Sequence, residues 1–559
     1  MATVLRRDGE PIVLELDLTE PLQLETPADP LSAFRSRHRT RLRDLLDGLR
    51  RGATDPHVVG LIAEVGVGPG LAIAQEVRAA VQAFRRSGKP AFAWAETFGE
   101  FSAGNSGYAL ATGFDQIWLG ESGDLGLTGV GAEATFLKPA LERVGLQVEL
   151  GQRYEYKNAA NALTADGFTD AHREAMQRLV ESASDQLARD IAAARGLSRE
   201  RLAELIDAAP LAPEDALAAG LIDQIGYRDQ VHAALRRAVG GRMHLQYVTR
   251  YQRSLTNEAT RLVTERVRTR RSGEIALIHA TGPIRLGRSG GPSPLGGHAM
   301  GSSTVSAAVR SAVKADQVKA IVLRVDSPGG SYAASDIIRR EIVLARAAGK
   351  PVIVSMGSLA GSGGYFIAMP ADVVVALPAT LTGSIGVFGG KLVAEGLLDR
   401  LGVGSGPVAA GAHALMSSNR RPYTADERAL LDRWLDRVYA DFTAKVAHDR
   451  QLDGERVHEL ARGRVWTGVD AFERGLVDEL GGLEVAIRLA RERSGLPARP
   501  DSGDVRLYPR NRPGGRLTPP ESSEDIAAAR GGWGSFADLA SRLGLPAAGP
   551  LLMPVRLTA

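Results

Sequence analysis

The sequence predicts an α/β protein made of two tandem copies of one domain, each with a mainly parallel sheet. The strongest observation is an internal repeat at a shift of 257 residues: residues 103–108 read Ala-Gly-Asn-Ser-Gly-Tyr, and residues 360–365 read Ala-Gly-Ser-Gly-Gly-Tyr. The second observation is that short apolar strands alternate with longer helical stretches in both halves, which is typical of β-α-β units. Together these patterns indicate an internal duplication.

The expected elements follow the same order in both halves. An apolar run forms the first strand. It is followed by a helix, a second strand, a Gly-rich turn with a second helix, and a third strand. The Gly-Lys-Pro sequence before the third strand ends the second helix, because Gly and Pro interrupt helices. The first-half elements are expected at 12–16, 34–49, 55–62, 72–84 and after 88–90, and those of the second half at 275–278, 303–313, 316–322, 334–347 and after 349–351.

Changes in composition divide the chain into four parts. The repeat continues beyond its best-matched segment, with Gly-Leu-Ile-Asp at 220–223 against Gly-Leu-Val-Asp at 475–478. A stretch rich in Pro, Gly, Arg and Ser follows the second copy, and such composition favours disorder. We expect a first domain over 1–240, a helical linker over 241–272, a second domain over 273–495, and a largely disordered tail over 496–559 with a short helix near 536–543.

Composition excludes several classes of protein. The 68 Lys and Arg residues nearly balance the 65 Asp and Glu residues, and a net charge of +3 gives no support for nucleic acid binding. Cys is absent, which excludes disulfides, thiolate nucleophiles and Cys-based metal sites. No run approaches ~18 apolar residues, so we expect no membrane-spanning helix. The N-terminus lacks the apolar core and cleavage site of a secretory signal.

Ser362 is the candidate nucleophile. It lies between Gly361 and Gly363 after an apolar strand. A Ser flanked by Gly can occupy a sharp turn, with its hydroxyl exposed and the next N–H free to bind an oxyanion. An ordinary helix N-cap would explain the same residue. The first half has Asn105 in the equivalent position, so only the second half carries a hydroxyl there.

Gly329 and Gly330 form a second candidate element, because they follow a strand and precede a helix. Glycines in this place let backbone N–H groups approach an anion or a developing oxyanion, although these residues alone favour a plain strand-to-helix turn. The first-half counterpart at 66–70 is similar to a dinucleotide-binding loop. Leu71 stands where the third Gly of that loop is required, so we expect no dinucleotide cofactor.

No His lies at a telling distance from Ser362 in the sequence, so a His could reach it only through folding, and a Lys can serve as the base instead. A Lys can act as a base when burial lowers its pKa from about 10.4 towards neutrality, and a shift of three units costs about 4 kcal/mol. Lys89 and Lys350 occupy equivalent places before a strand and are expected to be structural. The chain has only eight lysines: Lys89, Lys138, Lys157, Lys314, Lys319, Lys350, Lys391 and Lys445.

The second half resembles the catalytic domain of the signal peptide peptidase (protease IV) family. The matching stretches are DSPGGS at 326–331, SMGSLAGSGGYFIA at 355–368 and TGSIGVFGG at 382–390. The duplicated region, about 1–490, resembles the long two-domain form of that family. The resemblance implies two tandem Clp/crotonase-like spiral β-α domains, and a serine protease that uses a Ser/Lys dyad.

The resemblance also implies roles for individual residues. The nucleophile is Ser362, and the base comes from the first half, from the segment Tyr-Lys-Asn-Ala at 156–159, as Lys157. Ser384 corresponds to the hydroxyl that orients the Lys amine, although a turn Ser would look the same. The expected oxyanion donors are the N–H groups of Gly363 and of Gly329 or Gly330.

The repeat supports Lys157 independently of the resemblance. A shift of 257 or 255 residues from Lys157 leads to Ala414 or Ala412, so the second half has the Ser without this Lys. The first half has the Lys without the Ser. Lys391, close to the TGSIGVFGG stretch, is the rival base and is expected to be structural.

The family cuts hydrophobic peptides, notably signal peptides left after secretion, without a metal or cofactor. It often forms a bowl-shaped tetramer, so the resemblance implies a homo-oligomer. Many relatives carry an N-terminal membrane anchor that this sequence lacks. We therefore expect a location in the cytoplasm, or peripheral contact with the cytoplasmic membrane.

Two other functions stay open at this stage. One is an acyl-CoA enzyme of the crotonase type, because the folds are alike; it predicts a CoA-binding groove and acidic catalytic residues after the Gly-rich turns. The other is a non-catalytic scaffold at a membrane, which predicts that Ser362→Ala leaves the cellular phenotype intact.

Overall fold

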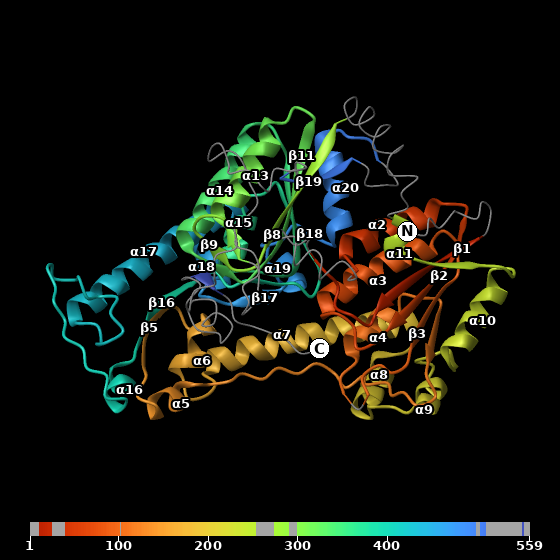
Figure 1. Ribbon diagram of the computed structural model, residues 1–559, viewed down its shortest axis with the longest axis horizontal. Coiled ribbons are helices and arrows are strands. Elements are labelled where there is room, and N and C mark those ends of the chain that lie inside the picture. The colour runs from red at the N-terminus through yellow and green to blue at the C-terminus, as the bar shows by residue number, and fades with distance from the viewer. Residues whose placement is uncertain are drawn as a thin grey trace.

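The computed structural model describes residues 11–24, 40–100, 102–252, 273–289, 299–498, 504–509 and 551–552. Two α/β domains lie side by side, and the long helix α7 (Asp170–Arg195) runs from the first domain along the second (Figure 1). The fold class expected from the sequence is confirmed: each half contains a mainly parallel sheet with helices on both faces.

All the strand pairs in the sheet of the first domain are parallel, in the order β6-β4-β3-β2-β1-β7. Its strands read as continuous apolar runs because helices cover both faces of the sheet. Helices α2, α3 and α4 pack on one face, and α10 packs on the other. The strands are β1 (Ile12–Leu18), β2 (Val58–Val65), β3 (Ala91–Ala95), β4 (Gln116–Leu119), β6 (Gln224–Ile225) and β7 (His244–Tyr247). The helices are α2 (Leu42–Thr54), α3 (Leu71–Arg85), α4 (Asn105–Ala111), α8 (Arg199–Asp207), α9 (Pro213–Ala218), α10 (Arg228–Ala238) and α11 (Val248–Gln252).

The second domain repeats this topology. Its strands β19-β8-β11-β13-β14-β18 occupy the places of β7-β1-β2-β3-β4-β6, and β15 and β17 add a branch from β13. The strands are β8 (Glu274–Thr281), β11 (Val318–Ser327), β13 (Val352–Gly361), β14 (Val373–Ala376), β15 (Leu381–Gly383), β17 (Val465–Thr467), β18 (Glu479–Leu480) and β19 (Val505–Tyr508). The helices are α13 (Ser302–Lys314), α14 (Tyr332–Ala347), α15 (Gly363–Ala368), α17 (Ala425–Arg450), α18 (Gly454–Leu460), α19 (Gly468–Glu473) and α20 (Leu483–Ser494).

The duplication extends to single ion pairs. Asp115 accepts a hydrogen bond from the first residue of β3 and pairs with Arg85, while Asp372 accepts one from the first residue of β13 and pairs with Arg346. The expected structural lysines also match. Lys89 donates to the carbonyl oxygens of Gly52 and Asp55, and Lys350 to those of Ala315 and Val318. These shared contacts belong to the scaffold and not to the chemistry.

Two edge strands lie outside the domain limits expected from the sequence. β7 falls in the stretch expected as a helical linker and pairs with β1, and β19 falls in the stretch expected as a tail and pairs with β8. Both add one parallel strand to the open edge of a sheet, which satisfies backbone groups that would otherwise be unpaired. The helix expected at 536–543 lies outside the described residues.

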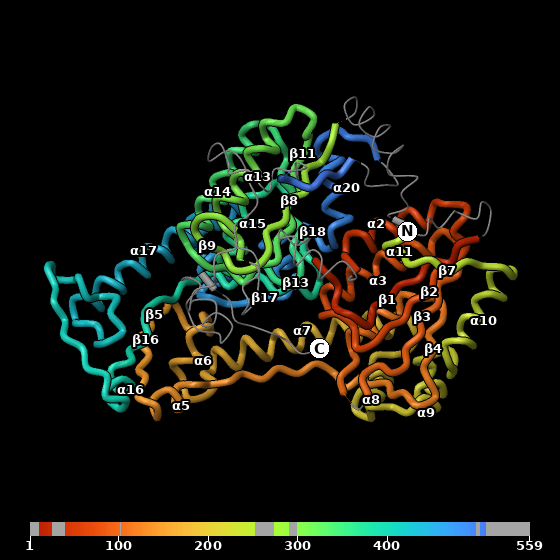
Figure 2. Tube along the Cα trace, viewed as in Figure 1, coloured from red at the N-terminus to blue at the C-terminus, as the bar shows by residue number. Residues whose placement is uncertain are grey.

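A two-stranded antiparallel ribbon joins the halves. Figure 2 shows β5 (Gln147–Arg153), from the first half, beside β16 (Val387–Val393), from the second. Helix α17 packs across both strands. The remaining short elements are α5 (Lys138–Arg143), η1 (Asn158–Ala160), α6 (Asn161–Thr164), β9 (Ile284–Arg285), β10 (Met300–Gly301), β12 (Gly329–Gly330), α16 (Glu395–Arg400) and β20 (Leu551–Leu552). The ribbon carries first-half residues onto the second domain.

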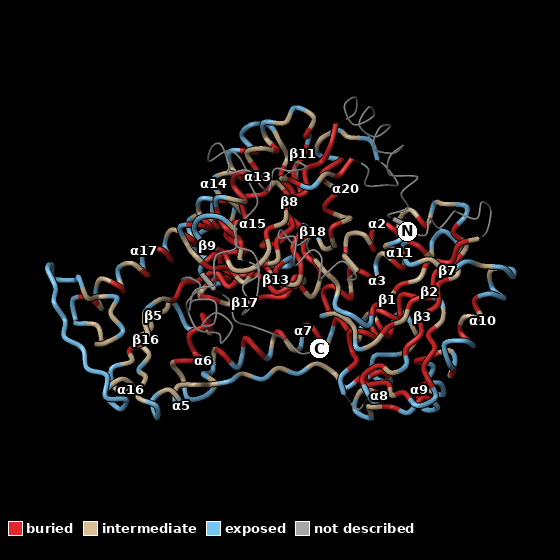
Figure 3. The backbone as a smooth tube through the Cα atoms, in the orientation of Figure 1, coloured by how far each residue is buried: buried red, intermediate tan, exposed pale blue. Residues whose placement is uncertain are grey.

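The sheets hold the most buried residues of both domains, whereas the outer end of the ribbon region is exposed (Figure 3). A buried ion pair also crosses between the domains. The Arg324 guanidinium on β11 contacts both carboxylate oxygens of Glu76 on α3, at 2.6 and 3.2 Å. Glu76 also accepts the backbone N–H of Leu483 at the start of α20. Within the described residues, no helix is both long enough and apolar enough to cross a bilayer.

Replacing Glu76 with Gln is expected to lower the free energy of unfolding by about 3 kcal/mol or more, because Arg324 becomes an unpaired buried charge. Urea unfolding followed by circular dichroism measures the change. The control is Glu492→Gln in the exposed pair Arg488–Glu492, where the loss should stay below about 1 kcal/mol. Equally small losses in both variants would show that the buried pair does not hold the domains together.

Candidate active site

Ser362 occupies a sharp turn between β13 and α15. Its backbone has φ 55° and ψ −113°, a conformation that non-Gly residues rarely adopt, and its N–H donates to the carbonyl oxygen of Gly383 at 2.8 Å. The flanking glycines are required by space. A Cβ on Gly363 would lie 3.1 Å from the Gly329 Cα, and one on Gly364 would lie 2.6 Å from the Ser327 carbonyl oxygen.

The N-cap alternative does not describe the Ser362 side chain. Ser362 stands at the N-cap position of α15, but its hydroxyl makes no capping hydrogen bond to that helix. It accepts a hydrogen bond from Lys157 Nζ instead, at 2.8 Å, and both side chains are fully buried. The turn therefore presents the hydroxyl to a residue from the other half of the chain.

Lys157 follows β5 and precedes η1, so the ribbon delivers it to the second domain. Nζ lies 3.0 Å from both the hydroxyl and the carbonyl oxygen of Ser384, in addition to Ser362. Burial lowers the pKa of Lys157 to about 7, because the interior disfavours the ammonium form. As an ammonium, Lys157 donates to all three of these oxygens. Once neutral, the amine has two N–H groups for the two Ser384 oxygens and one lone pair that can accept the Ser362 O–H instead.

Ser384 is also held in a strained turn, with φ 51°, and is almost fully buried. Its N–H donates to the carbonyl oxygen of Arg464 at 2.7 Å. The structure therefore brings Ser362, Lys157 and Ser384 into one cluster.

The expected oxyanion elements lie next to this cluster. Gly363 begins α15, and the first N–H groups of a helix have no partner within it. The space in which a Gly363 side chain would lie is bordered by Gly329 and Gly330. The Gly329 N–H donates to Ser327 Oγ at 3.1 Å, so this group already has a partner in the unliganded chain.

Lys391, the rival base, is engaged elsewhere. Its Nζ donates to the carbonyl oxygen of Met416 at 2.9 Å and lies 4.1 Å from the centre of the Tyr423 ring. The first-half counterpart of Ser362 is also structural: the Asn105 side chain donates to and accepts from the backbone of Gly129. The described residues contain no cluster of three His, Cys, Asp or Glu side chains that could hold a metal ion.

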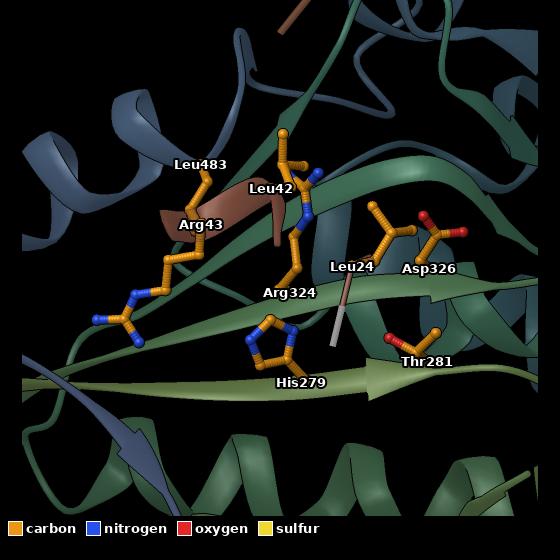
Figure 4. Close-up of a pocket in the computed structure, with 8 residues that line it drawn as sticks. All are labelled: Leu24, Leu42, Arg43, His279, Thr281, Arg324, Asp326 and Leu483. Atoms are coloured by element: carbon orange, nitrogen blue, oxygen red, sulfur yellow. The ribbon is translucent and has the colours of Figure 1, made fainter. Parts of the chain in front are cut away.

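A separate small pocket lies between the domains (Figure 4). First-half residues Leu24, Leu42 and Arg43 face second-half residues that include His279 and Asp326. Burial lowers the pKa of His279 to about 3, so the ring is neutral. Asp326 accepts the N–H of Ser358, which ties the Gly-rich turn to β13. None of the three clustered residues lines this pocket.

The sequence analysis missed the turn at 462–464, between α18 and β17. A Cβ on Gly463 would lie 2.5 Å from the Lys157 backbone, so this turn packs directly against the candidate base. One signal was available. At a shift of 255 residues, Arg-Gly-Arg at 462–464 corresponds to Asp-Ala-Ala at 207–209, so the halves differ here as they do at Ser362.

Comparison with known proteins finds protease relatives that match both halves of the chain. Residues 83–241 and 344–497 match the peptidase family S49, with one matched segment in each half. Protease 4 of Salmonella typhi is 32% identical over 464 residues, covering 81% of this chain and 72% of that protein. The chloroplastic serine protease SPPA of Arabidopsis thaliana is 30% identical over 459 residues, covering 82% and 66%.

A shorter relative matches one part of the chain. The putative signal peptide peptidase SppA of Enterococcus faecium is 36% identical over 170 residues, which is 30% of this chain and 49% of that protein. With both matched segments together spanning more than half of its length, the chain belongs to the peptidase family S49 and is a serine protease.

Proposed function

We propose that the protein hydrolyses peptide bonds through an acyl-enzyme, with Ser362 as nucleophile and Lys157 as general base. The observation that carries this proposal is the 2.8 Å contact between Lys157 Nζ and Ser362 Oγ, with both residues fully buried. A buried amine with a pKa of about 7 is largely neutral in mildly alkaline solution and can accept a proton.

The geometry supports a two-step mechanism. Lys157 takes the proton of Ser362 as Oγ attacks the carbonyl carbon, and the resulting oxyanion lies against the Gly363 N–H, with Gly329 or Gly330 as second donor. The Lys157 ammonium then protonates the leaving amine. Water deacylates the enzyme with Lys157 again as the base, while Ser384 keeps the amine directed at Oγ.

The chain itself indicates how a peptide would bind. Leu551 and Leu552, which form β20, pair antiparallel with Gly329 and Gly330 and lie beside β16. We propose that substrates add to this edge as an extended strand. In this mode main-chain hydrogen bonds provide the affinity, and pockets for the side chains provide the specificity. Apolar peptides, such as signal peptides released after secretion, are the proposed substrates, in line with the name of the Enterococcus relative.

The two alternatives raised by the sequence leave the central contact unexplained. In a crotonase-type enzyme, a buried amine directed at a serine hydroxyl would have no catalytic role. In a scaffold, the strained turn at Ser362 would have no function. Assembly as a homo-oligomer, a tetramer by resemblance, and work in the cytoplasm or at the membrane surface are proposed with the function. Exposed Leu401 and Val408, at and beyond the end of α16, offer apolar surface for such contacts.

Ser362→Ala and Lys157→Ala are each expected to lower kcat for a fluorogenic apolar peptide by at least about 10³-fold, because each removes one partner of the dyad. Lys391→Ala is the matched control and should keep wild-type activity. Full activity in Lys157→Ala together with loss in Ser362→Ala would place the base elsewhere. Failure of folded wild type to react with a serine-directed probe would favour the scaffold.

The rate should rise with pH through about 7, because Lys157 accepts a proton only in its neutral form, which predominates above its pKa. Measuring kcat/KM between pH 5.5 and 9 in a constant-ionic-strength buffer gives the apparent pKa. A rate that falls across this range, or one that does not change, contradicts a neutral Lys base.

Removing residues 551–559 is expected to lower KM at unchanged kcat, since Leu551 and Leu552 pair with Gly329 and Gly330 and would compete with substrate there. A synthetic peptide of sequence LLMPVRLTA should raise KM of the shortened enzyme, and a scrambled peptide serves as the control. An unchanged KM in the shortened enzyme, with no effect of either peptide, would remove this support for strand-like binding.

A further inference from the structure

We propose that Arg464 is a positioning residue for the Ser/Lys dyad, and that residues 462–464, here called the 462–464 turn, form a clamp that holds Lys157 and Ser384 together. The inference rests on the proposed function. The 462–464 turn supplies no reacting atom, and it lies outside the sequence motifs that identify Ser362, Lys157 and Ser384.

The backbone of the 462–464 turn connects the two residues that surround the Ser362 hydroxyl. The Arg464 carbonyl oxygen accepts the Ser384 N–H at 2.7 Å, and the Arg462 carbonyl oxygen accepts the Tyr156 N–H at 3.1 Å. Gly463 N–H donates to the Ile385 carbonyl oxygen at 2.8 Å. Three successive residues thus hold the turn of Ser384 and the residue before Lys157 at a fixed separation.

Gly463 brings this backbone into direct contact with Lys157. Its φ is +88°, and an added Cβ would lie 2.5 Å from the N, Cα and Cβ atoms of Lys157. Only Gly tolerates both the conformation and the approach. The turn therefore packs against the first atoms of Lys157, where its buried side chain begins.

The Arg464 side chain secures Tyr156, the neighbour of Lys157. Its guanidinium carbon lies 4.8 Å from the centre of the Tyr156 ring and 4.5 Å from that of Trp466. It also pairs with Glu174 on α7 at 2.8 Å, and Glu174 accepts the Tyr156 hydroxyl at 2.6 Å. Stacking and the shared carboxylate fix the Tyr156 ring from two directions.

The duplication provides an internal comparison. In the second half, Thr382 pairs with Trp466, and in the first half the equivalent Leu125 pairs with Leu211, so the strands after the two turns correspond. The first-half turn has Asp-Ala-Ala at 207–209 in place of Arg-Gly-Arg. The half without a nucleophile thus lacks both the glycine and the stacking arginine, which ties these residues to the dyad and not to the shared scaffold.

The clamp acts through the burial of Lys157 more than through charge. Burial is the cause that lowers the pKa of Lys157. The charged groups around its segment are Arg464 with Glu174, and Arg462 with Glu155, and each cation is paired with a carboxylate. Loosening the clamp would admit water, and loss of the Arg464 guanidinium would leave the Glu174 charge without its paired cation; both changes favour the ammonium form of Lys157.

The test is Arg464→Gln, assayed with the apolar peptide substrate across pH. We expect kcat at pH 7 to fall at least about 5-fold, KM to change little, and the midpoint of the pH profile to move upward by one unit or more, so that activity recovers in alkaline solution. Arg464→Lys keeps the charge facing Glu174 and should recover part of the shift. Arg474→Gln is the matched control, because Arg474 stacks on the same Trp466 but pairs with Asp470 and Glu473 instead of Glu174.

A wild-type pH profile in Arg464→Gln, or a loss that is equal at every pH, overturns the proposal and leaves Arg464 a structural role. If this variant fails to fold, Tyr156→Phe decides, since it removes only the hydroxyl bonded to Glu174 and should shift the profile in the same direction by a smaller amount; an unshifted profile overturns the proposal. Failure of the dyad itself is distinguishable, because it would show as full activity in Lys157→Ala.

Discussion

The chemistry proposed for this protein depends on one contact, the approach of a fully buried lysine amine to a serine hydroxyl that lies in the other half of the chain. Neither group is of much use alone, since a serine hydroxyl is a weak nucleophile and a solvated lysine is protonated at neutral pH. Burying the amine is costly, and the antiparallel ribbon and the 462–464 turn hold the Lys157 backbone in the place where its side chain is buried. The interdomain ion pair of Arg324 and Glu76 adds a second, independent tie between the halves.

The duplicated fold separates scaffold from chemistry. Contacts present in both halves, such as Asp115 and Asp372 at the starts of equivalent strands, hold the sheets. The contacts at the Ser362 position, by contrast, differ between the halves. Asn105 bonds its own loop in the first half, whereas Ser362 faces Lys157 in the second. In the proposed mechanism the first half supplies the base and the second half supplies the nucleophile, so the activity would require both domains in their observed arrangement.

Much of this arrangement could be predicted from the sequence, because apolar strands, Gly-rich turns and a long repeat are local signals. The partnership of Ser362 and Lys157 followed from the complementarity of the halves and from the family resemblance. The edge strands β7 and β19 were not predicted, since their pairing depends on which sheet edge lies open after folding. The 462–464 turn was missed for a similar reason: its importance comes from packing against residues some 300 positions earlier, although the difference between the two copies marks it.

The most direct test of the account is a titration of Lys157 itself, by NMR of protein carrying ¹³C-labelled lysine. Only eight lysines contribute signals, and Lys157→Met identifies the signal of interest by its loss. The account predicts that this signal titrates near pH 7, well below the other lysines. A Lys157 that titrates near the ordinary value of about 10.4 would contradict the central claim, because the residue would then be protonated whenever the enzyme is expected to work.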